Sequence, residues 1–206
     1  MKKILALAAG ICLIFAFAAC GGGSESEKPV NVAIDDIQIQ TNFDGYDFSE
    51  IESYEDLDWG ELSDSEKESF WNAIVNSGVY DSTHTFQDAD SGAVFSVGVV
   101  DLTNAEGDDP VDTYIAGLVG MNSHEDSEGL MIGDAETTNA LLLKYSPEYF
   151  GVDMEEGSLI DEFMIGCNEK VYDFIVVTPD GNPDSVAKAL SEAITLPYEP
   201  ETDEAE

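Results

Sequence analysis

Two histidines, His84 and His124, are the imidazoles that this sequence offers for acid–base or metal chemistry. His84 lies in the apolar-alternating segment VYDSTHTF and His124 in the polar segment NSHEDSEG, and neither has a second histidine at ligand spacing. A zinc site needs several cysteine, histidine or acidic ligands placed close together. We therefore interpret His84 as a strand-face residue and His124 as a solvated loop residue, and we predict no metal site and no cofactor.

The stretch Asp88-Ala89-Asp90-Ser91-Gly92 resembles the opening of a calcium loop. Such a loop places oxygen ligands at alternate positions and closes with a bidentate glutamate, but here Ala93 and Val99 occupy two of those positions. A tight turn between two strands explains the same residues, because aspartate and serine side chains bond readily to nearby backbone. We favour the turn.

Hydrolytic chemistry has no specific signature either. The sequence contains no G-x-S-x-G motif, the elbow that exposes a nucleophilic serine in one large hydrolase class. Its 44 acidic residues guarantee some close carboxylate pairs, so a pair alone does not identify a glycosidase. Asp108, Asp109 and Asp112 cluster where a helix is expected to begin, and negative charge stabilises that position by about 0.3–1 kcal/mol. We predict no catalytic residue and no enzymatic activity.

The N-terminal segment carries the most specific pattern. Lys2 and Lys3 precede an uncharged apolar run over residues 4–19. That run would form a helix of roughly 24 Å at ~1.5 Å per residue, which is shorter than the ~30 Å hydrocarbon core of a bilayer. Such a length is typical of a secretory signal peptide. The simplest interpretation of the segment is an ordinary signal peptide followed by an incidental cysteine.

A lipoprotein signal is the interpretation that we favour, with the opening segment as a point of attachment to the membrane. Phe17-Ala18-Ala19-Cys20 resembles a bacterial lipobox, in which small residues precede an invariant cysteine, although the lipobox usually has leucine where Phe17 stands. The resemblance implies a lipoprotein signal peptide over residues 1–19, diacylglyceryl transfer to the Cys20 thiol, and cleavage before Cys20. Two acyl chains anchor a protein stably where one holds marginally. Lipidated Cys20 and the following residues, 20–29, would form a flexible tether. The expected location is the extracytoplasmic face of the cell membrane, with the lipid on Cys20 as the membrane partner.

The charge of the chain limits its partners. The formal net charge is −37, there is no arginine, and five lysines follow Cys20. Nucleic-acid binding requires a basic surface, so we exclude it. The acidic surface favours solubility; a high-salt habitat or weak divalent-cation binding would also fit. A basic protein partner would be attracted electrostatically.

Cysteine usage predicts no disulfide framework. Cys12 would leave with the signal peptide and Cys20 would carry lipid, so Cys167 has no intramolecular partner. Cys167 ends the apolar run FMIGC, where a buried thiol packs as a small hydrophobic group.

Three segments carry helix signals. Ser63 and Glu66 form a capping box ahead of an apolar face that ends before Gly78. Asp109-Pro110 and Asn182-Pro183 each place a capping residue before a proline suited to a first turn. The apolar faces are Phe70, Trp71, Ile74 and Val75 in the first segment, Val111, Tyr114, Ile115, Leu118 and Val119 in the second, and Val186, Ala187, Leu190 and Ile194 in the third.

Apolar runs and alternation predict strands at residues 79–86, 93–102, 130–132, 138–146, 159–167 and 171–178. Before them, the alternating pattern over residues 30–43 changes phase at Asp35-Asp36, which indicates two short strands or one bulged strand. Asn168-Glu169 is expected to turn the last two strands as a hairpin. Residues 44–61 mix acids with aromatics without a clear period, and we expect an ordered loop that wraps the core.

The aromatics of residues 43–59 have two interpretations. Tyrosine and tryptophan among acids could recognise a cationic or sugar ligand, but such residues more often cover one end of a sheet. We favour the second interpretation. In total we expect a single α+β domain over residues 30–196, an antiparallel β-sheet flanked by helices, followed by a disordered acidic tail over residues 197–206.

Residues 93–196 resemble the PsbP-like superfamily in their order of elements. The segments that carry the resemblance are AVFSVGVVDL, PVDTYIAGLVG, TTNALLLKYS and EFMIGCNEKVYDFIVVTPDGNPDSVAKALSEAITL. The resemblance implies an α/β/α sandwich and, because family members include assembly factors and partner-binding adaptors, a non-enzymatic role. It covers about half of the chain and contains no catalytic motif.

The sequence leaves three hypotheses for function. The first is a membrane-anchored extracytoplasmic lipoprotein that acts as a non-catalytic binding or accessory module. The second is an extracytoplasmic hydrolase that uses carboxylates, and the third is a lipoprotein that captures a ligand or cation. Two carboxyls facing across a cleft, with raised pKa values, would favour the hydrolase, whereas a shallow sheet face rimmed by exposed aromatics would favour the module.

Overall fold

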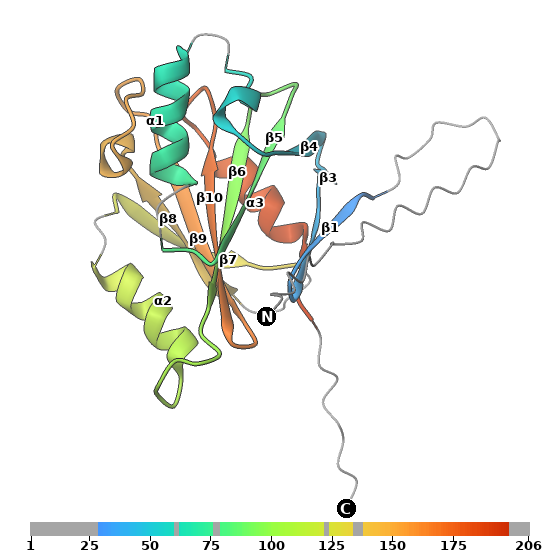
Figure 1. Cartoon of the computed structure of the whole chain (residues 1–206), viewed down its shortest axis with the longest axis vertical. Helices are drawn as coiled ribbons and strands as arrows, with labels where there is room; N and C mark the ends of the chain where they lie inside the picture. The colour runs from blue at the N-terminus through green and yellow to red at the C-terminus, as the bar shows by residue number, and fades with distance from the viewer. Residues whose placement is uncertain (1–28, 60–61, 76–78, 122–123, 134–137, 198–206) are drawn as a thin grey trace, which may run out of the picture.

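The computed structural model describes residues 29–59, 62–75, 79–121, 124–133 and 138–197, and its elements are drawn in Figure 1. The predicted signal peptide, Cys20, nearly all of the predicted tether and nearly all of the predicted tail lie outside these residues. Within them, no helix is both long and apolar enough to cross a membrane.

Two antiparallel sheets contain the strands of the described chain. The larger has eight strands in the order β3 (Asn42–Phe43), β4 (Tyr46–Ile51), β5 (Ser82–Asp88), β6 (Val94–Asp101), β10 (Lys170–Val177), β9 (Ile160–Cys167), β8 (Thr138–Tyr145) and β7 (Asp126–Met131). The smaller has the order β1 (Asn31–Ile34), β2 (Ile37–Gln40) and β11 (Ile194–Thr195). The helices of the described residues are α1 (Asp64–Ile74), α2 (Pro110–Met121) and α3 (Asp184–Glu192), with short 3₁₀ turns η1 (Tyr54–Asp56) and η2 (Pro147–Phe150). The chain therefore has the predicted α+β class.

All three predicted helices form near their predicted starts. The capping box of α1 is present, and the Ser63 backbone N–H donates to Glu66 Oε2 at 2.7 Å. Helix α2 begins at Pro110, and α3 begins directly after Pro183. Proline suits these positions because its fixed φ matches the first turn and its missing N–H would have had no partner there.

The tight hairpins also follow from local sequence. Cys167 and Lys170 are cross-strand partners, so Asn168-Glu169 is the two-residue turn between β9 and β10, as predicted. Asn168 has φ +55°, a left-handed conformation that asparagine adopts more readily than most residues. Asp35, with φ +48°, turns β1 into β2, so this region forms two strands and not one bulged strand.

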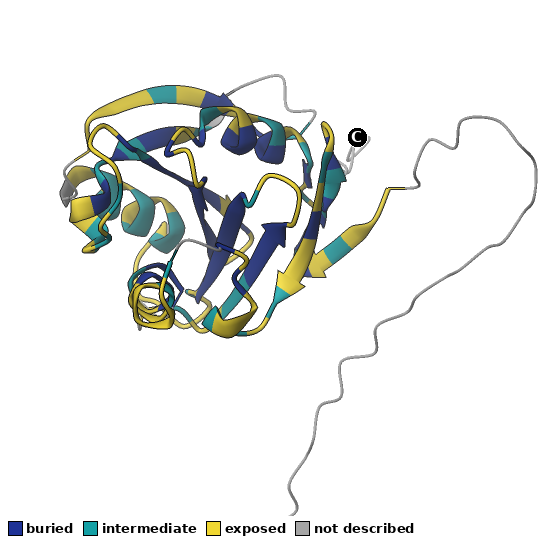
Figure 2. Ribbon diagram, turned by 90° about the horizontal axis from the view of Figure 1, so that it is seen from above, coloured by how far each residue is buried: buried dark blue, intermediate teal, exposed yellow. Residues whose placement is uncertain are grey.

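Alternate residues of β10 show how the helices cover the large sheet. Tyr172, Phe174 and Val176 lie in the same cluster as Val186, Ala187 and Leu190 of α3. The intervening residues face the other helices: Ile175 and Val177 pack with Phe70, Trp71 and Ile74 of α1, and Val171 packs with the stripe of α2. Because successive side chains of a strand point to opposite faces, α3 covers one face and α1 with α2 cover the other. The central strands are consequently buried on both faces (Figure 2).

Residues 44–61 differ from the prediction. Residues 46–51 form strand β4, which pairs with β5 and extends the large sheet. The period is hard to see because Phe48 is the one buried residue of β4, while Glu50 on the same face and Asp47 on the other are both exposed. Strand β7 also begins earlier than predicted, at Asp126, and the two-residue β11 was not predicted.

Candidate functional site

Helix α2 is apolar but incompletely covered. None of the residues from Pro110 to Gly120 is fully buried. By contrast, α1 buries Phe70, Trp71 and Ile74, and α3 buries Val186, Ala187, Leu190 and Ser191. An amphipathic helix normally buries its apolar stripe against the core. Helix α2 therefore leaves part of its apolar surface available for another contact.

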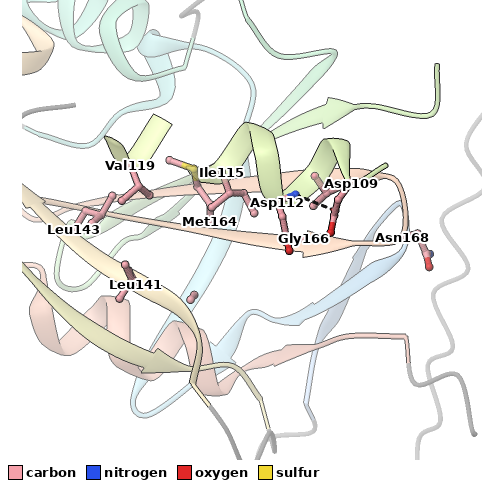
Figure 3. Close-up of a pocket in the computed structure, with 11 residues that line it drawn as sticks. Asp109, Asp112, Ile115, Val119, Leu141, Leu143, Met164, Gly166 and Asn168 are labelled. Carbon is pink, nitrogen blue, oxygen red and sulfur yellow. Dashed lines mark hydrogen bonds between the residues drawn. The ribbon is translucent and has the colours of Figure 1, made fainter. Parts of the chain in front are cut away.

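A groove of about 610 Å³ runs between α2 and the neighbouring strands β8 and β9 (Figure 3). Its apolar lining comes from Val111, Ile115 and Val119 of α2, Ala140, Leu141 and Leu143 of β8, and Met164 and Gly166 of β9. Asp109 and Asp112 at the start of α2, together with Asn168 of the hairpin turn, complete the lining with polar groups. The groove thus has an apolar floor and acidic groups at one end.

Gly166 determines how closely α2 approaches the sheet. A Cβ atom at this position would lie 2.5 Å from Cγ1 of Val111, a distance that real Cβ atoms do not tolerate. Gly166 therefore lets the start of α2 lie against β9. The far end of the groove is more open, and Leu141 there is 44% exposed.

Two buried acids, Glu162 and Asp173, lie next to the groove floor on the same face of the sheet. Asp173 is the cross-strand partner of Met164, and Glu162 is the partner of Leu143, and both partners line the groove. Glu162 is 5% exposed and Asp173 is 4% exposed. Neither acid lines the groove itself, so the structure has a carboxyl pair beside a groove and not a cleft with two carboxyls facing across it.

Burial disfavours the charged forms of this pair. The pKa of Asp173 is raised well above its ordinary value by burial and by the nearby Glu162 carboxylate. Burial also raises the pKa of Glu162, although hydrogen bonds from Tyr145 and Asp173 lower it in part. Two carboxyls this close do not both ionise readily in a site of low polarity. Burial and mutual repulsion therefore favour a protonated form of the pair.

Tyrosines surround the pair. The Tyr80 hydroxyl donates to Asp173 Oδ2 at 2.6 Å, and its ring lies over Gly98, where a Cβ would be 2.5 Å from ring atoms. Tyr114 of α2 packs against the cluster that contains Met164, the cross-strand partner of Asp173, and its pKa is raised by burial and then by Asp173 and Glu162. Tyr145 of β8 stacks on Tyr149 with ring centroids 4.9 Å apart.

A second acidic cluster lies on the opposite face, beside α3. Asp161 is fully buried there, and burial followed by repulsion from Asp184 raises its pKa to about 7, against the attraction of Lys144. Lys144 Nζ lies 2.5 Å from Asp184 Oδ1, and Lys188 Nζ lies 2.6 Å from Glu128 Oε1. The two lysines are thus shared among three acids.

The histidines take separate places. His84 Nδ1 lies 2.9 Å from Glu50 Oε1 on strand β4. His124 follows α2 and lies against Tyr145, with ring centroids 6.3 Å apart. His124 is exposed, as predicted, but it also contacts the ring that bonds Glu162. Within the described ranges, no group of three or more His, Cys, Asp or Glu side chains is arranged to hold a metal ion.

The remaining candidate residues have structural roles. Asp88 accepts from the Ser91 backbone N–H at 2.8 Å and from the Asp47 backbone N–H at 2.8 Å, so the Asp88–Gly92 stretch is the predicted turn. The Asp112 backbone N–H donates to Asp109 Oδ1 at 3.4 Å at the start of α2. Cys167 is a free, buried thiol, as predicted.

The aromatics of residues 43–59 belong largely to the core. Phe43 and Phe48 are buried in the α3-side cluster. Trp59 packs against Phe70 with ring centroids 4.6 Å apart and the rings tilted by 52°, and it donates from Nε1 to the Gly92 carbonyl at 2.6 Å. This confirms that they cover one end of the sheet.

Sequence reasoning missed the buried acids. A signal for them does exist: Asp161-Glu162 and Asp173 interrupt the otherwise apolar runs SLIDEFMIGC and VYDFIVV. Acids in the middle of strands that are buried on both faces have no solvated side to point to, so such interruptions indicate buried, perturbed carboxyls.

No protein-family model matches this chain, and no curated protein matches it. Among solved structures, the chain is similar to a crystal structure, at 1.50 Å resolution, of a protein from Bacteroides thetaiotaomicron VPI-5482, with 11% sequence identity and a TM-score of 0.42. The likeness covers 80% of this chain and 46% of the other, so this chain spans about half of that protein's length. A similarity at this level assigns neither a family nor a function.

Proposed function

We propose that this protein is a lipid-anchored, extracytoplasmic binding or accessory module, held at the membrane through Cys20, and that the groove between α2 and the β8–β9 strands is its binding surface. The partner we propose is a protein segment that combines apolar side chains with lysine or arginine. The observation that carries this proposal is the apolar α2 stripe, which is half-covered and lines an open groove.

Charge supports the choice of partner. Asp109 and Asp112 lie at one end of the groove, and the chain carries a net charge of −37. Apolar side chains on the floor would supply most of the affinity, while the acidic groups would orient a basic segment and speed its approach. Such binding weakens with added salt, because exposed charges are screened over ~8 Å at physiological ionic strength.

Site-directed photo-crosslinking tests this proposal. A photoreactive residue at Leu141, 44% exposed in the groove, is compared with one at Val79, which is 61% exposed and lies outside the groove. We expect salt-sensitive adducts with a basic protein from position 141 and none from position 79. Leu141→Glu should abolish binding of that partner, while Val79→Glu should leave it unchanged. Equal adducts from both positions would refute the groove as the binding surface.

A carboxylate-dependent hydrolase is the second candidate, and the Glu162–Asp173 pair favours it, since perturbed acids often mark catalytic centres. It ranks second because a substrate must reach the reacting carboxyls, and these are 5% and 4% exposed and do not line the groove. Screening the protein against ester, glycoside and peptide substrates separates the two. Turnover that disappears in Glu162→Gln or Asp173→Asn would establish the hydrolase.

We also propose that the fold is a PsbP-like α/β/α sandwich. The order of elements and the helices on both faces of an antiparallel sheet support this. An experimental structure that superimposes poorly on PsbP-like domains over residues 93–196 would refute it.

A further inference from the structure

The two acids beneath α2 each have one oxygen without a hydrogen-bond donor. When both carboxyls are ionised, Glu162 Oε2 and Asp173 Oδ1 are buried and have no donor among the described residues, whereas Asp173 Oδ2 accepts from Tyr80. A buried acceptor without a donor is unfavourable, because it has lost its hydrogen bonds to water and gained none in return. The two carboxyls are within hydrogen-bonding reach of each other, so one proton shared between them would supply the missing donor and leave a single negative charge.

We propose that Glu162 and Asp173 share one proton beneath α2, and that loss of this proton unseats α2 and removes one wall of the groove. This regulation rests on the binding function proposed above. It makes ligand binding in the groove strongest when the pair holds its proton and weaker as the pH rises through the titration of the pair.

Among the described residues, no lysine is placed to replace the proton. The four lysines of the described chain bond elsewhere: Lys67 to the Leu57 carbonyl, Lys144 and Lys188 to Asp184 and Glu128, and Lys170 to Asp35 and Asp36. The titratable groups that face the pair are the hydroxyls of Tyr80, Tyr114, Tyr145 and Tyr149, and His124 contacts the outer side of Tyr145. A second carboxylate charge must therefore be hydrated or left unbalanced.

Helix α2 is the element that can admit water to the pair. Tyr114 of α2 packs against the same cluster as Met164, the cross-strand partner of Asp173, and Ile115, the next residue, lines the groove. None of the residues from Pro110 to Gly120 is fully buried, so lifting α2 uncovers less apolar surface than lifting α1 or α3. Elements with few buried contacts open at the lowest free energy. Ionisation of the pair and seating of α2 are consequently coupled.

Amide hydrogen exchange on the full chain in detergent micelles tests this coupling without any ligand. Protection of α2 amides is compared with protection of α3 amides between about pH 6 and about pH 9, after correction for the intrinsic pH dependence of exchange. One released proton shifts an equilibrium about tenfold per pH unit above the pKa of the pair. We expect the protection of α2 amides, relative to that of α3 amides, to fall as the pH rises, by up to about tenfold per pH unit.

Variants identify the groups responsible. Glu162→Gln and Asp173→Asn each prevent the doubly charged state, so α2 protection should become independent of pH in both. Glu169→Gln, an exposed acid in the adjoining hairpin turn, should keep the native profile. A native profile that is flat with pH would overturn the proposal, as would the same slope in both pair variants or a loss of slope in Glu169→Gln. Crosslinking from position 141 tests the groove separately, so failure of one proposal does not imply failure of the other.

Discussion

Replacing Asp161 with asparagine perturbs the acid cluster beside α3 at its most buried member. The carboxyl is fully buried, and its pKa is about 7 instead of the ordinary 3.8. Between about pH 3.8 and about pH 7, Asp161 is protonated in the folded protein and ionised in the unfolded chain. The contribution of Asp161 to stability is therefore greatest below about pH 4, falls as the pH rises towards 7, and becomes level above 7.

The size of the effect follows from these two pKa values. Linkage gives a cost for Asp161 of about 2.3 kcal/mol at about pH 5.5 and about 4.3 kcal/mol at about pH 8.5. Asparagine is neutral at both pH values and keeps nearly the same shape. The free energy of unfolding of Asp161→Asn, taken relative to that of the native protein, should therefore be about 2 kcal/mol higher at about pH 8.5 than at about pH 5.5. Any fixed cost of the amide is the same at both pH values and cancels in this comparison.

Urea unfolding measures this difference. Trp59 and Trp71 are both 8% exposed, so their fluorescence should report unfolding of the α1 side of the core. Asp90→Asn, at an exposed position of the β5–β6 turn, is the matched control and should show no pH-dependent gain. If Asp161→Asn differs from the native protein by the same amount at both pH values, then Asp161 does not titrate near 7 and the reasoning is wrong.

Three further predictions concern the anchor, the helix contact and the cooperativity of the fold. Cys20→Ser should leave the protein unprocessed or release it from the membrane fraction, and fractionation that still finds a processed, membrane-bound variant would contradict lipidation. Gly166→Val should clash with Val111 and cost about 1–3 kcal/mol, measured by urea unfolding, with loss of crosslinking from position 141; unchanged values would show that α2 does not lie where Figure 3 draws it. Thermal unfolding should give one transition that neither chelator nor reductant shifts, and two separated transitions would make the region before residue 79 an independent unit.

Local signals predicted most of the fold. The capping box at Ser63, Asp109 before Pro110, and Pro183 located the helices, and the turn residues Asn168-Glu169 located the central hairpin, because each of these features depends on neighbours within a few residues. Asn182, predicted to cap α3, does not do so, because Pro183 is the N-cap. The α+β class followed from the order of elements. Strand β4 was not predicted. Phe48 is its one buried residue, so the strand has no repeating apolar pattern from which it could be recognised.

The groove and the buried acids depend on tertiary contacts. The apolar stripe of α2 was predicted to pack on the core, and periodicity cannot reveal that β8 and β9 leave it half-covered. Glu162 and Asp173 lie in different strands, and their approach is set by the register of β9 against β10. Because the sequence contains 44 acidic residues, a pair of acids in it has no diagnostic value. The burial of Glu162 and Asp173, which the structure shows, distinguishes this pair from acids on the surface.

The scarcity of cations connects the buried acids to the composition of the chain. The sequence contains no arginine, and only five lysines follow Cys20, so buried carboxylates have few positive partners. Glu162 and Asp173 have none among the described residues, and Asp161 shares Lys144 with Asp184 and Glu128. Burial raises the pKa values of all three acids, and the scarcity of cations leaves little to oppose that rise. Raised carboxyl pKa values shift the stability of the folded state towards acid pH. The three acids should therefore make this protein more stable at mildly acidic than at alkaline pH, with opposite faces of one sheet contributing independently.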